Sequence, residues 1–536
     1  MAFPVRFRKK TGTVFHTPAR HSGASGGVAL RASSPIGAAG SPQSGVATVL
    51  VRKQPRTEII NGWLILIAIL GATITVADGL TRGPAAERAA SWNGPLEYVP
   101  YWGASLLAAV SLPLMFGYGS KARIPASEAV ALWFVFCTSA YTRDFSYIRL
   151  PGAPFFVTDM VLMILLVSIY LLRRPNGPRM PLAASLLLGM LFLAGMLAAA
   201  RGFLGNRETI LVLRDSALVV YALFLPVGYL LFGSWLAVKR LAVWFLLGTA
   251  LSVFNGFGWF FAAPLERRFI YIGIYILIAL VGTLGAITTR LLDWRIGWTL
   301  AGLLCLGLAL ANSRTLFVAL PILVLGILCG TALGRVRTSK VRIVLATLLP
   351  ASILVGAMAL FFLNTEAGRD FGERSAQGLA SGVLHPGEDA NWQFRLAAWS
   401  QAWKRFAEYP AGGEGFGIPF VFEIWDNDPR PHNTFLTVLY KMGLIGFLPL
   451  LGLIAHFFWT TLRTIRRNLE NRRAYWLWIL VITQIAFCIY GAANLLLESP
   501  FLASIFWLFM GLGLRMIWML DLDRALNRGW HGCQVE

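Results

Sequence analysis

Residues 391–410 read NWQFRLAAWSQAWKRFAEYP, and they lie in a polar stretch, Asn364 to Asn433, that separates long hydrophobic segments. The polar stretch holds ten of the 26 carboxylates of the chain. Five large apolar residues recur within it at alternating spacings of four and three: Trp392, Leu396, Trp399, Trp403 and Phe406. This spacing predicts one face of a helix that starts near Asn391 and stops at Pro410. Aromatic residues at this density are typical of a helix at a membrane interface.

The composition on either side of this stretch indicates a membrane protein. Of the 536 residues, 57% are hydrophobic and 14% are charged, whereas soluble domains have about 25% charged residues. Apolar runs of about 18 residues recur, and each can cross the hydrocarbon core as a helix. Lipid offers no hydrogen-bond partners, and the runs do not alternate as barrel strands would. The sequence therefore predicts an all-α polytopic integral membrane protein with about 12–14 transmembrane helices and one large extracytoplasmic loop containing an amphipathic helix.

The arrangement of these runs predicts the topology. Fourteen runs lie near 59–77, 100–117, 126–141, 154–172, 181–200, 209–232, 241–262, 270–288, 297–311, 315–333, 342–363, 433–461, 474–492 and 500–519. Lys and Arg gather in every second gap, from Lys121 and Arg123 to Arg472 and Arg473. By the positive-inside rule, both termini are cytoplasmic and the polar stretch lies outside.

The chain divides into five parts on this basis. Residues 1–57 form a basic tail that we expect to be disordered and cytoplasmic, 58–363 hold helices 1–11, 364–432 form the large outer loop, 433–519 hold helices 12–14, and 520–536 form a cytoplasmic tail. The first part has no acid and no apolar core, so it is not a cleaved secretory signal. The whole chain has a net charge of +21. A lipid-attracted cytoplasmic arm explains the basic tail better than nucleic-acid binding does. Five cysteines without CxxC spacing indicate neither a disulfide framework nor a metal site.

A histidine, His432, lies at the end of the outer loop and is the first candidate for a functional residue. His432 lies where the loop meets a span, beside Asn433, which can cap the helix that begins there. A histidine at the boundary of water and lipid can act as a base near neutral pH, or it can be an interfacial residue without chemistry. Arg395 stands beside the aromatic stripe, where it either has a function or only lays its stem along the aromatic face.

A glycine-rich turn, GGEGFG at 412–417, follows the predicted amphipathic helix. As a phosphate-binding signature it is weak, because no strand precedes it. It is either a helix exit that needs positive φ or a set of backbone N–H groups that approach an anionic ligand. Glu414 within it is either a solvated acid or a polar contact for a substrate.

Two further arginines lie in or at the edge of predicted spans. Arg214 and Arg314 occupy positions where an ionisable residue is costly enough that function is the default hypothesis. For Arg214, the neighbouring Asp215 can simply neutralise the charge. Arg201 and Arg207 are additional cations on the predicted outer side.

Taken in order, these motifs resemble the O-antigen ligase and polysaccharide polymerase superfamily. The order is an outer-loop Arg with Trp, a GxGFG-like turn, and His-Asn leading into a span with Gly443-Leu444-Ile445-Gly446. Ser313-Arg314-Thr315 is similar to the Ser-Arg element of that family, and RLPGAPFFVTDMV (149–161) is similar to its early-span motif. The resemblance covers about 140–460. The long basic tail, the fourteen spans and the acidic residue in the turn depart from the family pattern.

The resemblance implies a periplasmic-side enzyme of the bacterial inner membrane that moves a glycan from undecaprenyl diphosphate to an acceptor sugar hydroxyl. The reaction would invert the anomeric carbon and need neither metal nor cofactor. His432 and Arg395 would be catalytic, with His432 acting on the acceptor hydroxyl. Arg314, Arg214 and Arg395 would bind the diphosphate, since arginine is well suited to clamp phosphate groups. Glu414 and Asn433 would contact the substrate.

The acceptor remains open between a second lipid-linked chain, the lipid A core and a protein, with a slight preference for polymerisation of an exopolysaccharide or O-antigen. A chain-length regulator or export proteins are further partners that the resemblance allows. A lipid-linked oligosaccharide flippase is the alternative from another class, and it would favour ionisable residues in mid-span and internal symmetry. A non-catalytic envelope scaffold would tolerate replacement of His432 and the arginines.

Overall fold

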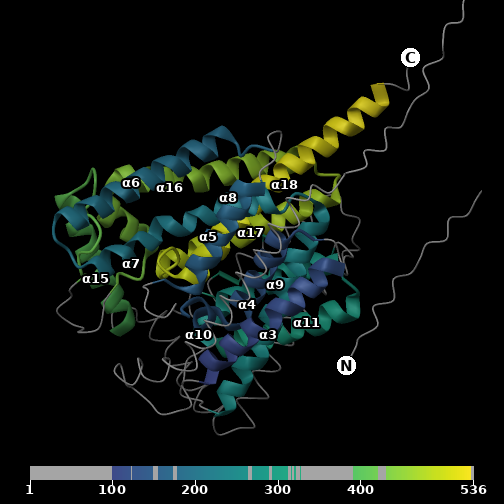
Figure 1. Ribbon diagram of the computed structural model, residues 1–536, viewed down its shortest axis with the longest axis horizontal. Helices are drawn as coiled ribbons and strands as arrows, with labels where there is room; N and C mark the ends of the chain where they lie inside the picture. Colours follow the sequence, from purple (N-terminus) through teal and green to yellow (C-terminus); the bar gives the residue numbers. More distant parts are fainter. Residues whose placement is uncertain are drawn as a thin grey trace, which may run out of the picture. The chain divides into compact units, whose positions relative to one another are not determined.

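The computed structural model (Figure 1) describes residues 99–121, 124–148, 155–172, 178–262, 269–288, 292–311, 390–420 and 430–532, with short pieces at 316, 319–320 and 326–327. All regular secondary structure in these ranges is helical, which confirms the all-α fold. The basic tail, the spans predicted near 59–77 and 342–363, most of the span near 315–333, and the first part of the outer loop lie outside the described residues.

The described helices follow the order of the predicted spans. Before the outer loop they are α3 (Val99–Lys121), α4 (Ala126–Ser146), α5 (Val157–Leu172), α6 (Leu182–Leu204), α7 (Thr209–Val220), η2 (Tyr221–Leu223), α8 (Phe224–Leu231), α9 (Trp235–Ala262), α10 (Phe269–Thr288) and α11 (Trp294–Ala311). From the outer loop onward they are α15 (Ala390–Glu408), α16 (Thr434–Arg467), α17 (Arg472–Ala493) and α18 (Pro500–Gly532).

Six of the described helical stretches are long and apolar enough to cross a membrane. They are Leu182–Leu204, Thr209–Leu231, Trp235–Phe254, Thr434–Arg467, Arg472–Ala493 and Pro500–Leu526. Shorter apolar helices occur at Ala104–Gly117, Val157–Leu171, Ile272–Thr288 and Arg295–Leu308. Each of these coincides with a span expected from the sequence. The chain is a multi-pass membrane protein, because such helices recur from α6 to α18.

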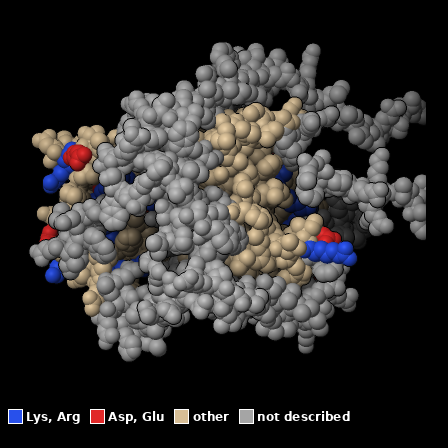
Figure 2. All heavy atoms as spheres, turned by 90° about the horizontal axis from the view of Figure 1, so that it is seen from below, with Lys and Arg blue, Asp and Glu red and all other residues tan. Residues whose placement is uncertain are grey.

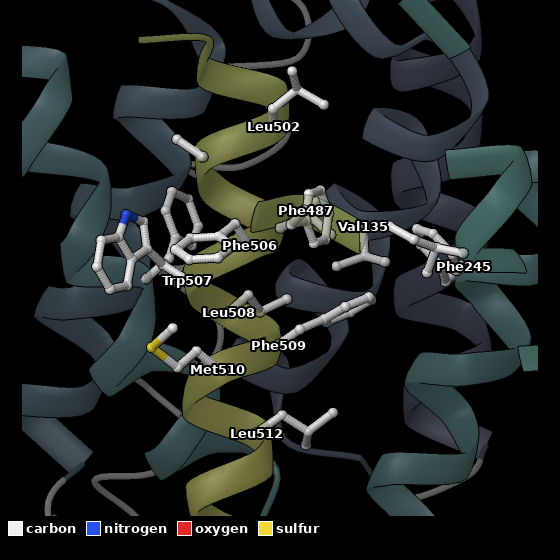
Figure 3. Close-up of a cluster of buried hydrophobic side chains, with 14 of the residues drawn as sticks. Val135, Phe245, Phe487, Leu502, Phe506, Trp507, Leu508, Phe509, Met510 and Leu512 are labelled. Atoms are coloured by element: carbon white, nitrogen blue, oxygen red, sulfur yellow. The ribbon is translucent and has the colours of Figure 1, made fainter. Parts of the chain in front are cut away.

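Helix α18 is the most deeply buried of the six spanning stretches, and its side chains pack against neighbours on several sides (Figure 3). The ring of Phe506 meets that of Phe487 on α17 with 5.8 Å between centroids, and Phe509 meets Phe245 on α9 at 5.4 Å. A helix that is apolar all round belongs in the interior of a bundle. Gly511 lets α18 approach α8 closely, because a Cβ there would collide with the Leu225 carbonyl.

Ion pairs join gaps that the positive-inside rule assigns to the same side. Arg240 at the start of α9 bonds Glu128 at the start of α4 with 2.9 Å between Nη1 and Oε1. Arg473 at the start of α17 bonds Asp523 of α18 at 2.6 Å. In the face shown in Figure 2, the described charged side chains lie mainly toward the two ends, and the described surface between them is largely uncharged. This distribution suits a membrane-embedded middle.

Helix α15 spans Ala390–Glu408, which agrees with the predicted start near Asn391 and the predicted stop at Pro410. Helix α18 continues to Gly532, so most of the segment expected as a C-terminal tail is helical. The predicted cap at Asn433 is confirmed, because its side chain accepts a hydrogen bond from the Leu436 N–H at 3.1 Å.

Candidate functional site

Helix α16 is interrupted one-third of the way along its length. Gly443 has φ of 60° and ψ of −162°, which are not helical values. In an unbroken helix, the N–H groups of Leu444 and Ile445 would donate to the carbonyls of Tyr440 and Lys441. The break releases these four backbone groups, and inside a membrane protein each needs another partner.

The loop that follows α15 supplies those partners. Four backbone hydrogen bonds join the two segments: Leu444 N–H to Pro410 O at 2.9 Å, Ile445 N–H to Ala411 O at 3.0 Å, Glu414 N–H to Tyr440 O at 2.9 Å, and Gly415 N–H to Lys441 O at 3.0 Å. The loop 409–420 is therefore inserted into the break as a backbone splint. We call it the splint loop.

Glycine is required on both sides of this contact. Gly413 has φ of 66°, and a Cβ there would collide with the backbone of Lys441 and Met442. A Cβ on Gly443 would collide with the backbone of Ala411 and with the Gly413 nitrogen. Gly415 and Gly417 also have positive φ, at 93° and 81°. The interpretation of GGEGFG as a turn that needs positive φ is confirmed.

The backbone N–H groups of the splint loop are used inside the protein. The N–H groups of five consecutive residues each donate to a protein acceptor: Gly413 to Tyr409 O, Glu414 to Tyr440 O, Gly415 to Lys441 O, Phe416 to Ala198 O, and Gly417 to Asp215 Oδ2. An anion cradle needs N–H groups that point at the ligand. These five N–H groups do not form one, so the alternative of a phosphate-binding turn is wrong for them.

Helix α6 holds the other side of the splint loop. Arg201 Nη1 donates to the carbonyls of Gly412 and Gly413 at 2.7 and 3.1 Å. A Cβ on Gly202 would lie 2.5 Å from the Phe416 carbonyl oxygen, so α6 and the loop approach closely. The cation of Arg201, predicted on the outer side, thus fixes the loop between α6 and α16.

A buried ion pair lies beneath the splint loop. Lys441 Nζ is 2.7 Å from Asp215 Oδ2, and the two side chains are 5% and 9% exposed. Lys441 also donates to the Ile418 carbonyl at 3.0 Å. Arg214 Nε lies 4.0 Å from the other Asp215 oxygen. The nearest cationic partner of Asp215 is therefore Lys441, and the idea that Asp215 mainly neutralises Arg214 does not describe this geometry.

A second carboxyl group, Glu498, lies in the turn between α17 and α18. Burial raises its pKa to about 7, and the nearby Asp215 carboxylate adds to the rise. The charges of Arg430 and Lys441 and a hydrogen bond with Thr437 act in the opposite direction. Among the described residues, Glu498 Oε2 has no hydrogen-bond partner. This turn therefore brings a group that titrates near neutrality to the same end of the bundle.

Glu414 is paired inside the loop. Its Oε1 is 3.3 Å from Arg405 Nη1 on α15, and the glutamate side chain is 8% exposed. Burial raises the pKa of the Glu414 carboxyl, and Arg405 and Lys441 partly oppose that rise. The guanidinium of Arg405 also lies over the Phe420 ring, 4.9 Å from its centroid. Glu414 is thus not the solvated loop acid that one interpretation of the sequence allowed.

His432 has an unusual backbone and contacts α15. Its φ of 47° is in the left-handed region, where a residue other than glycine costs about 1–3 kcal/mol. The preceding Pro431 carbonyl accepts a hydrogen bond from Trp399 Nε1 at 2.7 Å. The His432 ring meets the Phe394 ring edge-on, with 6.2 Å between centroids. Backbone strain of this kind clusters at functional sites.

Helix α15 brings Arg395 to this junction. Arg395 is half-buried, directly follows Phe394, and precedes Trp399 by about one turn. Ala398 and Ala402 of α15 are fully buried, and they pack in one cluster with Tyr440 of α16 and Phe420 of the splint loop. Leu396 and Trp403 of the aromatic stripe are 47% and 56% exposed. These two members of the stripe are available for the membrane interface predicted for this helix, whereas Trp399 and Phe406 pack inside the protein.

The structure gathers most of the residues selected from the sequence. Helix α15, which carries Arg395, contacts His432 beside Asn433; the splint loop, which carries Glu414, bonds α16; and Asp215, next to Arg214, bonds the same loop. Figure 1 shows α15 and α7 at the same end of the bundle. Arg314 lies outside the described residues. Four charged groups at this end were not predicted from the sequence: Lys441, Glu498, Arg405 and Arg430. Of these, Lys441 could have been found as an ionisable residue within an apolar span.

The fold and this site define a class: a helical multi-pass membrane protein with an interrupted span and a charged site at one end of the bundle. Residues 299–451, less than a third of the chain, match the family model described as O-antigen ligase. The match confirms the resemblance to the O-antigen ligase superfamily and supports a ligase or polymerase type of function. No curated protein matched the chain. The matched segment includes α15, the splint loop and the interrupted part of α16.

Proposed function

We propose that the chain transfers a glycan from undecaprenyl diphosphate to an acceptor sugar hydroxyl at the periplasmic face of the bacterial inner membrane. The observation that carries the proposal is that the segment matching the O-antigen ligase family contains the elements that meet at His432. Those elements hold His432, arginines and the buried Glu414 at one end of a membrane bundle. A soluble nucleotide-sugar donor is not needed when the donor is a membrane lipid.

The proposed chemistry uses His432 as a base. The acceptor oxygen attacks the anomeric carbon while the bond from that carbon to the diphosphate oxygen breaks, which inverts the configuration. The hydroxyl proton passes to the His432 imidazole, since a histidine can act as a base near neutral pH. Its attachment to both α15 and α16 supports this role, because a base must be held in position to act.

The leaving diphosphate requires cations that stabilise its developing charge. Arg395, Arg214 and Arg314 are the proposed diphosphate ligands, and Arg430, two residues before His432, joins them as a candidate. Arginine matches phosphate oxygens with two parallel N–H donors. Arg201, Arg405 and Lys441 are paired with acceptors of the splint loop or with Asp215, so we assign them to its architecture.

For the acceptor, we favour a second lipid-linked chain, which makes the protein a polymerase, over the lipid A core or a protein. Glu414 and Asn433 are the proposed sugar contacts: Asn433 directly follows His432, and Glu414 lies in the splint loop, where Arg405 holds its carboxylate. A chain-length regulator and export proteins are the proposed protein partners. This choice of acceptor rests on the resemblance, and the experiment below distinguishes the acceptors.

The test is complementation of a deletion strain of the source organism with His432→Ala, Arg395→Ala and Arg314→Ala. The variants are compared with wild type at matched membrane abundance, and Arg463→Ala, an exposed arginine at the other end of α16, is the control. Surface polysaccharide is separated by size, and lipid-linked repeats are extracted and measured.

Each outcome has a distinct meaning. Loss of long polymer with single lipid-linked repeats on the outer face supports a polymerase. Long polymer that stays on its carrier and never reaches the lipid A core supports a ligase. Repeats that accumulate on the inner face would favour the flippase, and normal polymer in all three variants would contradict the catalytic assignment.

A further inference from the structure

A second charged site lies far from the splint loop, within α18. Arg515 is 5% exposed, and its Nε and Nη1 have no hydrogen-bond partner among the described residues. No carboxylate of a described residue lies within ion-pair distance of the Arg515 guanidinium. An arginine buried in a membrane span is costly and normally has a partner. The two unsatisfied donors of Arg515, Nε and Nη1, are suited to an anion.

Two aromatic rings flank this guanidinium, and Tyr229 also forms a hydrogen bond with it, but Nε and Nη1 have no partner among the described residues. The guanidinium Cζ lies 4.2 Å from the centroid of the Trp518 ring and 5.6 Å from that of Tyr229. The Tyr229 hydroxyl donates to the Arg179 carbonyl at 2.8 Å. The rings stabilise the positive charge through their π faces. They leave the hydrogen-bonding capacity of Nε and Nη1 unused.

The start of α9 meets the same guanidinium. A Cβ built on Gly233 would lie 3.2 Å from Arg515 Nη2, so the arginine reaches the residue just before the α9 N-terminus. Ser234 there accepts a hydrogen bond from the Ala237 N–H at 3.2 Å. Trp235 Nε1, at the first residue of α9, is also buried without a hydrogen-bond partner among the described residues. Helix N-termini favour anions. The Arg515 guanidinium and the α9 N-terminus are therefore two independent features that both favour a negatively charged ligand.

The face of α18 that carries Arg515 continues toward lipid. Trp518 and Leu522 follow it at three and seven residues and are 37% and 43% exposed. Arg515 is fifteen residues from Pro500, or about 22 Å along the helix. This places it near the membrane boundary opposite the Glu498 turn, because the hydrocarbon core is about 30 Å thick. Exposed apolar side chains beside a buried cation suit a ligand with both an anionic head and a hydrocarbon tail.

We propose that Arg515 and the start of α9, Gly233–Trp235, bind the phosphate group of an anionic membrane lipid. Phosphate oxygens accept hydrogen bonds from Nε and Nη1, which present the two-donor geometry that arginine uses for phosphate. The acyl chains lie along Trp518 and Leu522. The site is separate from the proposed glycan site and serves to anchor α18 and α9 in the leaflet that the topology assigns to the cytoplasm.

The test is thermal unfolding of the purified full-length protein in neutral detergent during titration with phosphatidylglycerol. Phosphatidylcholine and inorganic phosphate are titrated in parallel. Arg515→Gln removes the charge, and Arg463→Gln is the matched control because that arginine is exposed. Gly233→Ala keeps the guanidinium and adds a methyl group beside Nη2, so it tests the site if Arg515→Gln does not fold.

We expect phosphatidylglycerol to raise the Tm of the wild type and of Arg463→Gln by several degrees. The rise should disappear in Arg515→Gln and be at least halved in Gly233→Ala, and phosphatidylcholine should give a smaller rise in every variant. Equal stabilisation by phosphatidylcholine, or an unchanged rise in Arg515→Gln and Gly233→Ala, would overturn the proposal. An equal rise with inorganic phosphate alone would overturn the assignment to a lipid.

Discussion

At the residue scale, the candidate site is a set of charges that long-range packing takes out of water. Asp215 and Lys441 are 226 positions apart, yet their side chains form a buried pair at 2.7 Å. Asp215 also accepts the Gly417 N–H, so it joins α7, α16 and the splint loop. Removal of one partner of a buried ion pair leaves the other charge uncompensated and strongly destabilises the folded state. Removal of either partner should therefore affect the geometry around His432.

The Asp215–Lys441 pair predicts strong coupling between its members. Lys441→Met removes the close cationic partner of the buried Asp215 carboxylate, leaving only Arg214 at 4.0 Å, and should cost about 3–5 kcal/mol of stability. Asp215→Asn keeps an acceptor for the Gly417 N–H but removes the negative charge. The double variant should therefore lose less stability than the sum of the two single variants. Unfolding of all three in detergent measures this, with exposed Lys404→Met as the control; strict additivity would disprove the coupling.

Glu498 predicts a pH dependence of stability. Its pKa is raised by burial from 4.5 to about 7. Between these values the folded state binds more protons than the unfolded state, so this contribution is complete below pH 4.5 and is lost as pH rises through about 7. Glu498→Gln should show a shallower fall in Tm between pH 5 and pH 8, on the order of a few degrees' difference. Parallel curves for wild type and variant would contradict the assignment, and exposed Glu408→Gln is the control.

At the scale of elements, the interrupted α16 and the splint loop form one unit. The break at Gly443 is possible because Pro410, Ala411, Glu414 and Gly415 satisfy the released backbone groups. The loop in turn is held by α6 through Arg201. Discontinuous helices in membrane proteins are tolerated only where other protein groups satisfy the backbone. The unit therefore positions the start of α16, and with it His432 and Asn433.

Glycine substitutions test this unit. Gly443→Ala and Gly413→Ala place a Cβ against backbone atoms in a conformation with positive φ, so each should lower stability by about 1–3 kcal/mol or more and reduce polysaccharide formation. Gly189→Ala on α6 is the matched control, because a Cβ there meets nothing within 4 Å. Tm in detergent and complementation are measured together. A tolerated Gly443→Ala would show that the splint is not needed.

At the scale of the whole molecule, gaps assigned to one side by charge are joined by contacts. Arg240 bonds Glu128 and Arg473 bonds Asp523, all at gaps expected inside. The turn between α17 and α18 and the start of α16 meet at a gap expected outside, where Thr434 Oγ1 accepts the Leu496 N–H at 2.7 Å. The alternation of basic gaps therefore agrees with the packing. Which side faces the cytoplasm stays a prediction.

Cysteine labelling tests the orientation. In a chain whose native cysteines are changed to serine, Tyr409→Cys in the splint loop should react with a membrane-impermeant maleimide in intact spheroplasts. Leu469→Cys, between α16 and α17, should react only after permeabilisation. Both native side chains are exposed, at 56% and 36%, so accessibility alone does not distinguish them. The reverse pattern would overturn the predicted topology and the proposed periplasmic site.

The sequence by itself determined the membrane class, the positions of the described spans, the end of α15 at Pro410 and the cap at Asn433. These features depend on local composition, periodicity and the backbone preferences of single residues. It also selected His432 and Arg395 as candidate site residues; Phe394, next to Arg395, contacts the His432 ring, and the roles of the two residues stay a prediction.

Only the tertiary structure decided how the charges pair and where the glycine-rich turn goes. Segments far apart in the sequence supply the partners of Asp215 and Arg201 and bury Glu498. They also bring the splint loop into the break in α16. Local patterns show that a backbone group or a charge needs a partner, but which partner reaches it depends on helix packing. The same holds for Arg515: only the packed bundle shows that its guanidinium is buried and that its Nε and Nη1 have no partner among the described residues.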